Sequence, residues 1–594
     1  MVKIGPAFGD YIRLEKRERH LGDSTRNYSI RSYILPAVLI IGVALIIVRL
    51  FFLQIIKGES FRNLSDVNRT RTIPIHAPRG IIFDSQGVPL VFNVPGFREV
   101  PASQRGEPSG ISLEDGETKL IGRDEALELL SKGKTNLEID SLRNYPYKDV
   151  TSHVLGYIGQ ISKDELEQKA FANYVGGDLI GKIGIEKEYE SLLRGINGKE
   201  LVEVDSMGKI IRKLGLTDPI PGQNITLTLD IALQKAAFEA MKDAKRGAVI
   251  VSNPKGEILA LLSGPSFDSN LFTMGEGYSV GVDSAYESIS QILLDQEDQP
   301  LLNRAIGGTY PPGSTFKLIT AAAGLEDKII DKNFVVEDTG IFSVGSFSFS
   351  NWYFTQYGKT EGDVNVVKAI QRSNDIFFYK LAAMVGVDKL SFFAEKFGLG
   401  KKLGIDLTGE QTGIVPTQEW KKETIGENWY LGDTYHYGIG QGYLLTTPLQ
   451  VNILTQAIAN EGIIYKPHLL RNPAFAKAST FANASADRSA GKEKFLSKGT
   501  IDLIKEGMIG SCSDGGVAWP LFDFKVKNNS VSIACKTGTA QHGDEDTLPH
   551  AWITLFAPAD NPEIIVTVLS ESSGEGSNIA APIAKKILEE WFGR

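Results

Sequence analysis

Apolar positions form one long run near the N-terminus of the chain. Between Tyr33 and Ile56 the side chains are apolar except at four positions, which are Pro36, Gly42, Arg49 and Gln54. This pattern predicts one membrane-crossing helix, because about 20 apolar residues span the hydrocarbon core of a bilayer. Arg49 lies near the far end of the run, where a long side chain reaches the lipid headgroups. We therefore expect a transmembrane anchor at residues 33–57.

The residues before this run carry an excess of basic side chains. Residues 1–32 hold four acidic side chains and seven basic ones, namely Lys3, Arg13, Lys16, Arg17, Arg19, Arg26 and Arg31. Such an excess is typical of the cytoplasmic side, so residues 1–32 are expected to form a cytoplasmic tail. A cleaved signal peptide is the alternative, but Gln54–Lys57 lacks the small side chains of a cleavage site. We expect a single-pass protein of the cytoplasmic (inner) membrane with everything after Lys57 outside.

Beyond the anchor the hydrophobic pattern predicts two regions. Residues 58–235 contain short strand-like runs, such as 71–75 and 80–83, among many turn residues, which is typical of a spacer domain. In residues 236–594, strand pairs near both ends enclose a middle block, about 314–460, with helical periodicity. Terminal strands around a helical middle predict an α+β fold with an antiparallel sheet.

Composition narrows the functional classes. The 594 residues are 42% hydrophobic and 23% charged, which indicates a globular chain of two or three domains. A net charge of -9 gives no basic surface of the kind that binds nucleic acid, so we expect no nucleic-acid partner. Cys512 and Cys535 are the only cysteines, which excludes a disulfide framework and a cysteine-rich zinc site. Whether these two cysteines pair is left open by the sequence.

Three short strings carry the candidate chemistry. They are Ser314-Thr-Phe-Lys317, Ser373-Asn-Asp375 and Lys536-Thr537-Gly538, and none contains histidine. This combination is typical of a serine nucleophile that lysine activates, as in penicillin-binding proteins and class A β-lactamases. The first string alone is weak evidence, because the same S-x-x-K spacing occurs at 131–134, 206–209, 252–255 and 489–492. The order of the three strings and their context make the signal specific.

The local pattern places these residues on particular elements. Pro311-Pro-Gly313 precedes a good helix former, so Ser314 should open a helix with Lys317 one turn further on. The ordinary alternative is a helix-capping serine and a surface lysine. For Lys317 to accept a proton near neutral pH, its pKa must fall through burial and a nearby cation, for which Lys536 is the candidate. A strand over 531–540 would carry Lys536, and Gly538 would let a substrate backbone approach that strand.

With these residues in view, the chain resembles the class B penicillin-binding proteins, and within them the elongation type, penicillin-binding protein 2. Further matching segments are Asn68-Arg-Thr-Arg-Thr, Ala77-Pro-Arg79-Gly80, Gly156-Tyr-Ile-Gly159, Gly438-Ile-Gly-Gln-Gly442, Thr447-Pro-Leu-Gln450 and His550-Ala-Trp552. The resemblance implies a penicillin-binding/β-lactamase-like transpeptidase domain, with an antiparallel sheet flanked by helices plus a helical subdomain, on an elongated mainly-β pedestal (dimerisation) domain. The expected pedestal covers residues 58–235 and the expected transpeptidase domain residues 236–594.

The resemblance also implies the reaction and the roles of individual residues. Ser314 would attack the D-Ala-D-Ala carbonyl of a peptidoglycan stem peptide, release D-Ala and pass the acyl group to an amine of a neighbouring stem peptide. Lys317 would be the general base, Ser373 and Lys536 would complete the proton relay, and Asp375 would belong to the same catalytic set. Backbone N–H groups of Ser314 and Thr539 would form the oxyanion hole. The substrate-binding residues would be Thr537, Gly538 and Thr539.

The same resemblance implies partners and inhibitors. β-Lactams would acylate Ser314, so the protein would be a target of penicillin. A membrane glycosyltransferase that polymerises glycan strands, together with other proteins of the cell-elongation complex, is the expected partner. The implied biological role is cell-wall elongation and maintenance of cell shape.

Two positions depart from the family pattern. Asp375 stands where division-type relatives have asparagine, which favours the elongation type. Cys535 stands where the family usually has glycine, which places a possible thiol beside Lys536. Some relatives bind zinc near the second string, but Val344–Asn374 contains no His or Cys. We therefore predict no metal and no other cofactor.

Two alternative functions remain open. A D,D-carboxypeptidase or β-lactam hydrolase would use water instead of an amine to resolve the acyl-enzyme. The sequence lacks a Glu-x-x-Leu-Asn string after Ser373 to orient such a water, and a secreted hydrolase needs no anchored spacer. A non-catalytic β-lactam-binding scaffold or sensor is the second alternative, although a tail of about 32 residues is short for a signalling domain.

Overall fold

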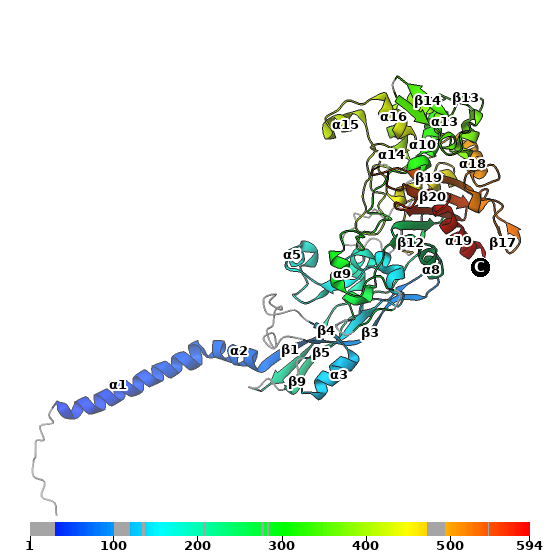
Figure 1. Cartoon of the computed structure of the whole chain (residues 1–594). Coiled ribbons are helices and arrows are strands. Elements are labelled where there is room, and N and C mark those ends of the chain that lie inside the picture. Colours follow the sequence, from blue (N-terminus) through cyan, green and yellow to red (C-terminus); the bar gives the residue numbers. More distant parts are fainter. Residues whose placement is uncertain are drawn as a thin grey trace, which may run out of the picture. The chain divides into compact units, whose positions relative to one another are not determined.

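The computed structural model describes residues 30–99, 119–133, 137–205, 210–274, 278–281, 284–345, 347–471, 494–544 and 546–594 (Figure 1). The chain divides into two compact units, which we describe separately. The smaller unit comprises Met1–Arg71 and Val202–Lys213, and the larger comprises Thr72–Leu201 and Leu214–Arg594. Most of the expected cytoplasmic tail, residues 1–29, lies outside the described residues.

The smaller unit carries the predicted apolar helix. Helix α1 (Arg31–Phe51) continues through a π-helical turn, η1 (Phe52–Ile56), and is followed by α2 (Gly58–Arg69). The stretch Tyr33–Ile56 is long and apolar enough to cross a membrane, and its side chains are not buried by other parts of the chain. Many of its large apolar side chains are exposed, among them Leu39, Ile46 and Ile55. Such exposure is unfavourable in water and favourable in lipid, which agrees with a membrane-spanning helix.

The region that follows the anchor is built mainly on two small sheets. One has the order β1-β8-β9, and the other has the order β10-β2-β3-β4 with β5 also paired to β3. Their strands are β1 (Thr70–Ile75), β2 (Ile82–Phe83), β3 (Pro89–Glu99), β4 (Lys119–Gly122), β5 (Leu137–Asn144), β8 (Gly198–Val204), β9 (Ile210–Thr217) and β10 (Ile225–Thr226). The strand-like runs predicted at 71–75 and 80–83 correspond to β1 and β2.

Short elements complete this region. A hairpin of β6 (Ile158–Gln160) and β7 (Leu179–Gly181) accompanies several short helices. These helices are α3 (Arg123–Ser131), α4 (Ser152–Leu155), α5 (Lys163–Leu166), α6 (Gly184–Glu188) and α7 (Glu190–Leu193), with 3₁₀ turns at Lys148–Thr151 and Lys169–Phe171.

A buried ionic cluster explains one of the sequence segments shared with the family. Arg79 Nη2 donates to Glu186 Oε2 and to Glu190 Oε2, each at 2.8 Å, and Arg143 Nε donates to Glu186 Oε1 at 2.7 Å. A Cβ on the adjacent Gly80 would lie 1.8 Å from the carbonyl oxygen of Gln223. Arg79 and Gly80 therefore have structural roles, because removing one partner of a buried ionic network leaves the other charge uncompensated.

The predicted antiparallel sheet forms the centre of the C-terminal region. Its order is β12-β11-β21-β20-β19, with every neighbouring pair antiparallel. The strands are β11 (Gly247–Ser252), β12 (Ile258–Gly264), β19 (Ala534–Ala540), β20 (His550–Ala557) and β21 (Ile564–Ser570). The first and last strands of this C-terminal region thus lie in one sheet, as the terminal strand pairs predict.

Helices cover both faces of this sheet. Helices α8 (Ile231–Ala240) and α19 (Ala580–Phe592) pack on one face (Figure 1). There Leu233, Ile583 and Ile587 join an apolar cluster with Val249 and Ile553. On the other face lie α17 (Pro448–Ala459), which packs on β11, β20 and β21, and the helices around α10 (Lys317–Glu326).

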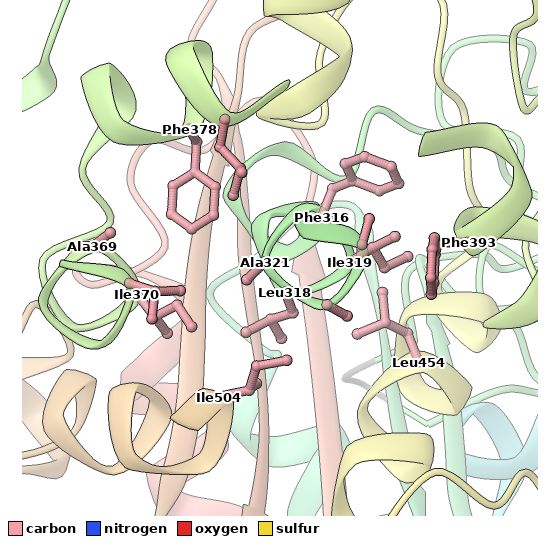
Figure 2. Packing of buried hydrophobic residues seen from close by; sticks show 14 of the residues in the cluster. Phe316, Leu318, Ile319, Ala321, Ala369, Ile370, Phe378, Phe393, Leu454 and Ile504 are labelled. Carbon is pink, nitrogen blue, oxygen red and sulfur yellow. The ribbon is translucent and has the colours of Figure 1, made fainter. Parts of the chain in front are cut away.

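The helical block surrounds α10. It contains α12 (Val366–Gln371), α13 (Asp375–Val385), α14 (Val387–Lys396), α16 (Leu431–Gly438) and α18 (Lys498–Ser511). Figure 2 shows Leu318, Ile319 and Ala321 of α10 among side chains from these neighbours, including Phe378, Phe393 and Ile504. Burial of each large side chain contributes about 1.5–3 kcal/mol, so α10 is held firmly in the core.

Smaller elements complete the C-terminal region. The remaining helices are α9 (Ile289–Leu294), α11 (Trp352–Tyr357) and α15 (Gln418–Thr424). Two-stranded pairs are formed by β13 (Val335–Asp338) with β16 (Gly362–Asn365), β14 (Ile341–Val344) with β15 (Phe347–Ser350), and β17 (Lys525–Val526) with β18 (Asn529–Ser530).

The two cysteines form a disulfide bond. Cys512 follows the end of α18 and Cys535 lies in β19, and both are buried. The sequence left this pairing open and suggested a possible thiol at Cys535. That suggestion is wrong, because the sulfur is bonded to Cys512, and the bond ties α18 to the strand that carries Lys536.

Removing the disulfide should lower stability. The bond spans a sequence separation of 23 residues, for which restriction of the unfolded chain predicts a loss of about 3 kcal/mol on removal. We expect the double variant C512S/C535S to unfold at a lower temperature, measured by differential scanning fluorimetry of the full chain in detergent. Reductant should lower the midpoint of the unsubstituted protein toward that of the variant and leave the variant unchanged. A variant as stable as the unsubstituted protein would contradict this role.

Candidate active site

Ser314 lies on the turn that leads into α10. Gly313–Phe316 forms a single 3₁₀ turn, which runs directly into α10 at Lys317, so the predicted start of a helix at Ser314 is confirmed. Gly313 has a φ of 53° and donates its N–H to the carbonyl oxygen of Gly440 at 2.9 Å. A side chain at Gly313 would be strained by this φ and would lie 3.1 Å from the carbonyl oxygen of Thr539. The glycine therefore lets the turn lie against β19.

Lys317 is fully buried at the centre of the site. Its Nζ donates to the carbonyl oxygen of Ser373 at 2.8 Å and to Asp375 Oδ1 at 2.7 Å, and lies 3.3 Å from Ser373 Oγ. Burial lowers the pKa of Lys317, and the carboxylate of Asp375 opposes that shift. The surface-lysine alternative is therefore wrong.

Lys536 reaches the same hydroxyl from strand β19. It lies in β19, is fully buried, and its Nζ donates to Ser373 Oγ at 2.8 Å and to the carbonyl oxygen of Thr537 at 3.0 Å. Burial and then the positive charge of Lys317 hold the pKa of Lys536 well below its usual range, while Asp375 opposes the shift. The sequence predicted that burial and the second lysine would act on Lys317. In the structure burial is the main cause for both lysines, and the effect of the second cation falls on Lys536.

Ser373 joins the two lysines from an unusual backbone position. It connects α12 to α13 with a φ of 53°, a left-handed conformation that serine adopts rarely. The next residue, Asn374, caps α13 by accepting the N–H of Phe377 on its side-chain oxygen at 2.9 Å. The turn therefore aims Ser373 Oγ at both Nζ atoms.

The substrate-binding candidates lie on an edge strand. Strand β19 is the last in the sheet, so one side of its backbone is not paired with another strand of that sheet. Gly538 lies against the turn that carries Ser314, because a Cβ there would be 3.1 Å from the carbonyl oxygen of Pro312 and 3.2 Å from Thr315 Cγ2. Thr537 is buried and Thr539 is exposed. Side chains and backbone of β19 thus border the serine turn.

Sequence reasoning missed two residues that hold Asp375. The backbone N–H of Trp352 donates to Asp375 Oδ2 at 3.1 Å, and Asn351 Oδ1 accepts the N–H of Asp375 at 3.2 Å. No motif signals these contacts, because one uses a main-chain amide and the other joins residues 24 positions apart.

One of the four other S-x-x-K matches lies within the described residues. There, Ser252 is buried in β11 and donates to Asn452, while Lys255 lies in an exposed turn. Each of the other three includes residues outside the described part of the chain. The three strings of the sequence analysis, in contrast, meet in one place.

The site has a serine at the start of a helix and two buried lysines that meet at a second serine beside the edge of an antiparallel sheet. This arrangement is typical of the serine enzymes that react with penicillin, which include penicillin-binding proteins and class A β-lactamases. Family comparison agrees: residues 247–589 match the penicillin-binding protein transpeptidase domain, and residues 131–227 match the penicillin-binding protein dimerisation domain.

Relatives that match nearly the whole chain show which kind of penicillin-binding protein it resembles. The chain is 35% identical to the peptidoglycan D,D-transpeptidase MrdA of Acinetobacter baumannii, over 96% of this chain and 88% of the relative. It is 32% identical to MrdA of Escherichia coli K12, over 96% of each chain.

Solved structures give the same result. Pseudomonas aeruginosa PBP2 in complex with WCK 5153 has a TM-score of 0.67 at 33% identity and covers 88% of this chain and 96% of its own. Helicobacter pylori PBP2 in complex with MreC has a TM-score of 0.70 at 29% identity, and the match covers 88% of this chain and 99% of the Helicobacter pylori chain.

The chain belongs to the MrdA, or penicillin-binding protein 2, family of peptidoglycan D,D-transpeptidases. It is a membrane-anchored enzyme that cross-links the cell wall, and its α+β fold and family membership are as the sequence predicted. The carboxypeptidase, hydrolase and scaffold alternatives are less well supported, since the named full-length relatives are transpeptidases.

Adding a methyl group at Gly538 should disturb the contact between β19 and the serine turn. In the variant G538A the new Cβ would be closer to Pro312 and Thr315 than ordinary contacts allow, so the strand or the turn must shift. We expect slower acylation by fluorescent penicillin and a loss of about 1–3 kcal/mol in stability.

A second glycine provides the matched control. Gly432 lies in α16, and apart from its chain neighbours and the adjacent backbone of its own helix, no heavy atom of the described residues would lie within 4 Å of a Cβ added there. G432A should therefore leave both acylation and the unfolding temperature unchanged, or raise the latter slightly, because alanine favours the helix more than glycine does. Equal behaviour of the two variants would contradict close packing at Gly538.

Proposed function

We propose that Ser314 is the nucleophile of the cross-linking reaction and that Lys317, Ser373 and Lys536 form its proton relay. The observation that carries this proposal is Ser373 Oγ, which lies 3.3 Å from Lys317 Nζ and 2.8 Å from Lys536 Nζ. A single hydroxyl between two buried amines provides a continuous path along which a proton can move.

In the acylation step, neutral Lys317 takes the proton of Ser314 while Ser314 Oγ bonds to the penultimate D-Ala carbonyl carbon. Backbone N–H groups of Ser314 and Thr539 stabilise the oxyanion. The peptide C–N bond then breaks, and the leaving D-Ala amine receives a proton through Ser373 and Lys536. In the second step an amine of a neighbouring stem peptide attacks the ester carbonyl carbon and gives up a proton to the same relay. The ester C–O bond then breaks, and Ser314 Oγ receives a proton back from Lys317.

Asp375 and burial act on Lys317 in opposite directions. Burial favours the neutral lysine that is needed to accept the proton, whereas Asp375, 2.7 Å away, stabilises the ammonium that forms afterwards. A base works best when its pKa is near the working pH, so the two effects together suit the lysine for proton transfer in both directions.

The edge strand is the proposed substrate-binding surface. Extended peptides bind exposed strand edges through main-chain hydrogen bonds, and Gly538 offers no side chain to obstruct that approach. Hydroxyl groups of Thr537 and Thr539 are suited to the terminal carboxylate of the stem peptide. β-Lactams would occupy the same surface and leave Ser314 acylated, which makes this enzyme a target of penicillin.

The membrane arrangement and partners are also proposed. The domain division is a cytoplasmic tail at 1–32, an anchor at 33–57, a pedestal at 58–235 and a transpeptidase domain at 236–594 outside the membrane. The basic excess before the anchor supports this orientation. A solved Helicobacter pylori PBP2 is bound to MreC, and a structure of a peptidoglycan synthase complex covers 95% of this chain at a TM-score of 0.69. These likenesses support elongation-complex partners, including a glycan-polymerising membrane glycosyltransferase.

Fluorescent penicillin should label this protein in membranes through Ser314. We expect the variant S314A to lose the label, because the substitution removes the hydroxyl that would attack the β-lactam from the 3₁₀ turn before α10. The measurement is in-gel fluorescence after detergent extraction, with S252A as the control at an unrelated S-x-x-K match. Labelling of S314A at the level of the unsubstituted protein would refute the assignment of the nucleophile.

Removing the Asp375 carboxylate should change the pH dependence of acylation. Acylation rises with pH as Lys317 loses its proton, and Asp375 raises the pKa of Lys317 against the effect of burial. In D375N that opposing effect is lost, so the pKa of Lys317 falls and the rising limb of the profile should move to lower pH. The profile is measured from the acylation rate with fluorescent penicillin. The control is D363N, at the exposed Asp363, which should leave the pH profile unchanged. A pH profile of D375N equal to that of the unsubstituted protein would contradict the effect of Asp375 on Lys317.

A further inference from the structure

The segment Ser373–Asp375 needs support from outside its own helices. Ser373 holds a left-handed φ of 53°, which is unfavourable for a residue with a side chain and persists only when its surroundings fix it. A hydroxyl that must face two Nζ atoms tolerates little displacement, because proton transfer depends on hydrogen-bond distance. Groups on neighbouring elements must therefore fix this turn.

Asp338 is a buried carboxylate surrounded by hydrogen-bond donors. It lies at the end of β13, and only 2% of its surface is exposed. Its Oδ2 accepts Asn351 Nδ2 and Asn374 Nδ2, each at 2.8 Å, and the N–H of Glu361 at 3.1 Å. Its Oδ1 accepts the N–H of Gly340 at 2.8 Å. A buried carboxylate that accepts this many hydrogen bonds holds each donor in place.

Asn351 and Asn374 connect Asp338 to the turn Ser373–Asp375 through hydrogen bonds. Asn351 Oδ1 accepts the N–H of Asp375, and Asn374 lies between Ser373 and Asp375 while capping α13. Each asparagine is fully buried, so water cannot replace these contacts. Two side chains therefore connect one carboxylate to the backbone directly after Ser373.

The elements around Asp338 give it a fixed position. Strand β13 pairs with β16, with Asp338 opposite Gly362. Glu361, whose N–H donates to Asp338, also accepts Arg372 Nε on its carboxylate at 2.7 Å, and Arg372 directly precedes Ser373. Glu361 and Arg372 thus form a third connection between Asp338 and the turn that carries Ser373.

We propose that Asp338 is a positioning residue for the transpeptidase reaction, whose carboxylate holds Asn351 and Asn374 so that Ser373 and Asp375 face Lys317 and Lys536. This inference rests on the proton relay proposed above. Asp338 does not touch the reacting atoms and acts only through the two asparagines. An asparagine in its place would present an N–H₂ group to at least one donor, and each of the hydrogen bonds described for the Asp338 carboxylate is with a donor.

The test measures chemistry separately from folding. The full chain in detergent is treated with fluorescent penicillin over a range of concentrations, which separates non-covalent binding from the acylation rate of the folded protein. We expect D338N to acylate at least about tenfold more slowly, with little change in the non-covalent dissociation constant, because the relay is displaced while the binding edge is kept. The thermal midpoint is recorded in parallel.

A second buried pair in this chain supplies matched controls. Asp268 is fully buried and accepts Asn270 Nδ2 at 2.8 Å, and Asn270 Oδ1 accepts the N–H of Tyr145 at 2.8 Å. D268N therefore makes the same chemical change in the same kind of network, away from the catalytic strings. It should lower the thermal midpoint and leave the acylation rate of the folded protein unchanged.

If D338N fails to fold, N351A replaces it, with N270A as its control. A slower acylation rate in D338N or N351A, beyond that of the matched control, supports the proposal. An acylation rate equal to that of the control, with only the thermal midpoint lowered, overturns it and leaves Asp338 a purely structural residue. S314A is run alongside. If S314A loses the label while D338N is unaffected, only the positioning role fails, whereas labelling of S314A refutes Ser314 as the nucleophile and with it the proposed function.

Discussion

The site depends on the burial of two lysines around one hydroxyl. An ammonium group in the protein interior is unfavourable, and two of them close together are more so, because each loses solvent and they repel each other. Lys317 and Lys536 are both fully buried and both donate to Ser373 Oγ, and among the described residues only the Asp375 carboxylate forms an ion pair with either of them. This cost falls when one of the two lysines loses its proton, which provides a neutral amine that can act as a base without a histidine.

The surrounding fold is what makes such burial possible. Helix α10 lies in the apolar core, and Lys317 in its first turn is fully buried between the fully buried Phe316 and Leu318. Lys536 is held by a strand in a five-stranded sheet whose other face is covered by α8 and α19. Each lysine is therefore fixed by a different layer of the domain, and Ser373 lies at their junction.

The sequence predicted the local parts of this arrangement well. Three-residue spacing placed Lys317 one turn after Ser314. The glycine at 538 led us to expect that a substrate backbone could approach β19, which stays a prediction, and the structure shows that this glycine lies against the turn that carries Ser314. Both features follow from short-range geometry. Contacts that join distant segments were not predictable: the pairing of Cys512 with Cys535, the N–H of Trp352 on Asp375 and the Asn351 amide have no periodic or compositional signature. Their geometry exists only after α11, α13 and α18 have packed.

The disulfide also changes what a cut in the chain would do. Cys512 and Cys535 enclose the segment 513–534, which includes exposed residues at Lys527 and Asn528 in the connection between β17 and β18. A protease that cleaves there would break the polypeptide, but the two pieces would stay covalently joined through sulfur. Strand β19, and Lys536 with it, would remain tethered to α18, so a nicked enzyme keeps its edge strand in place.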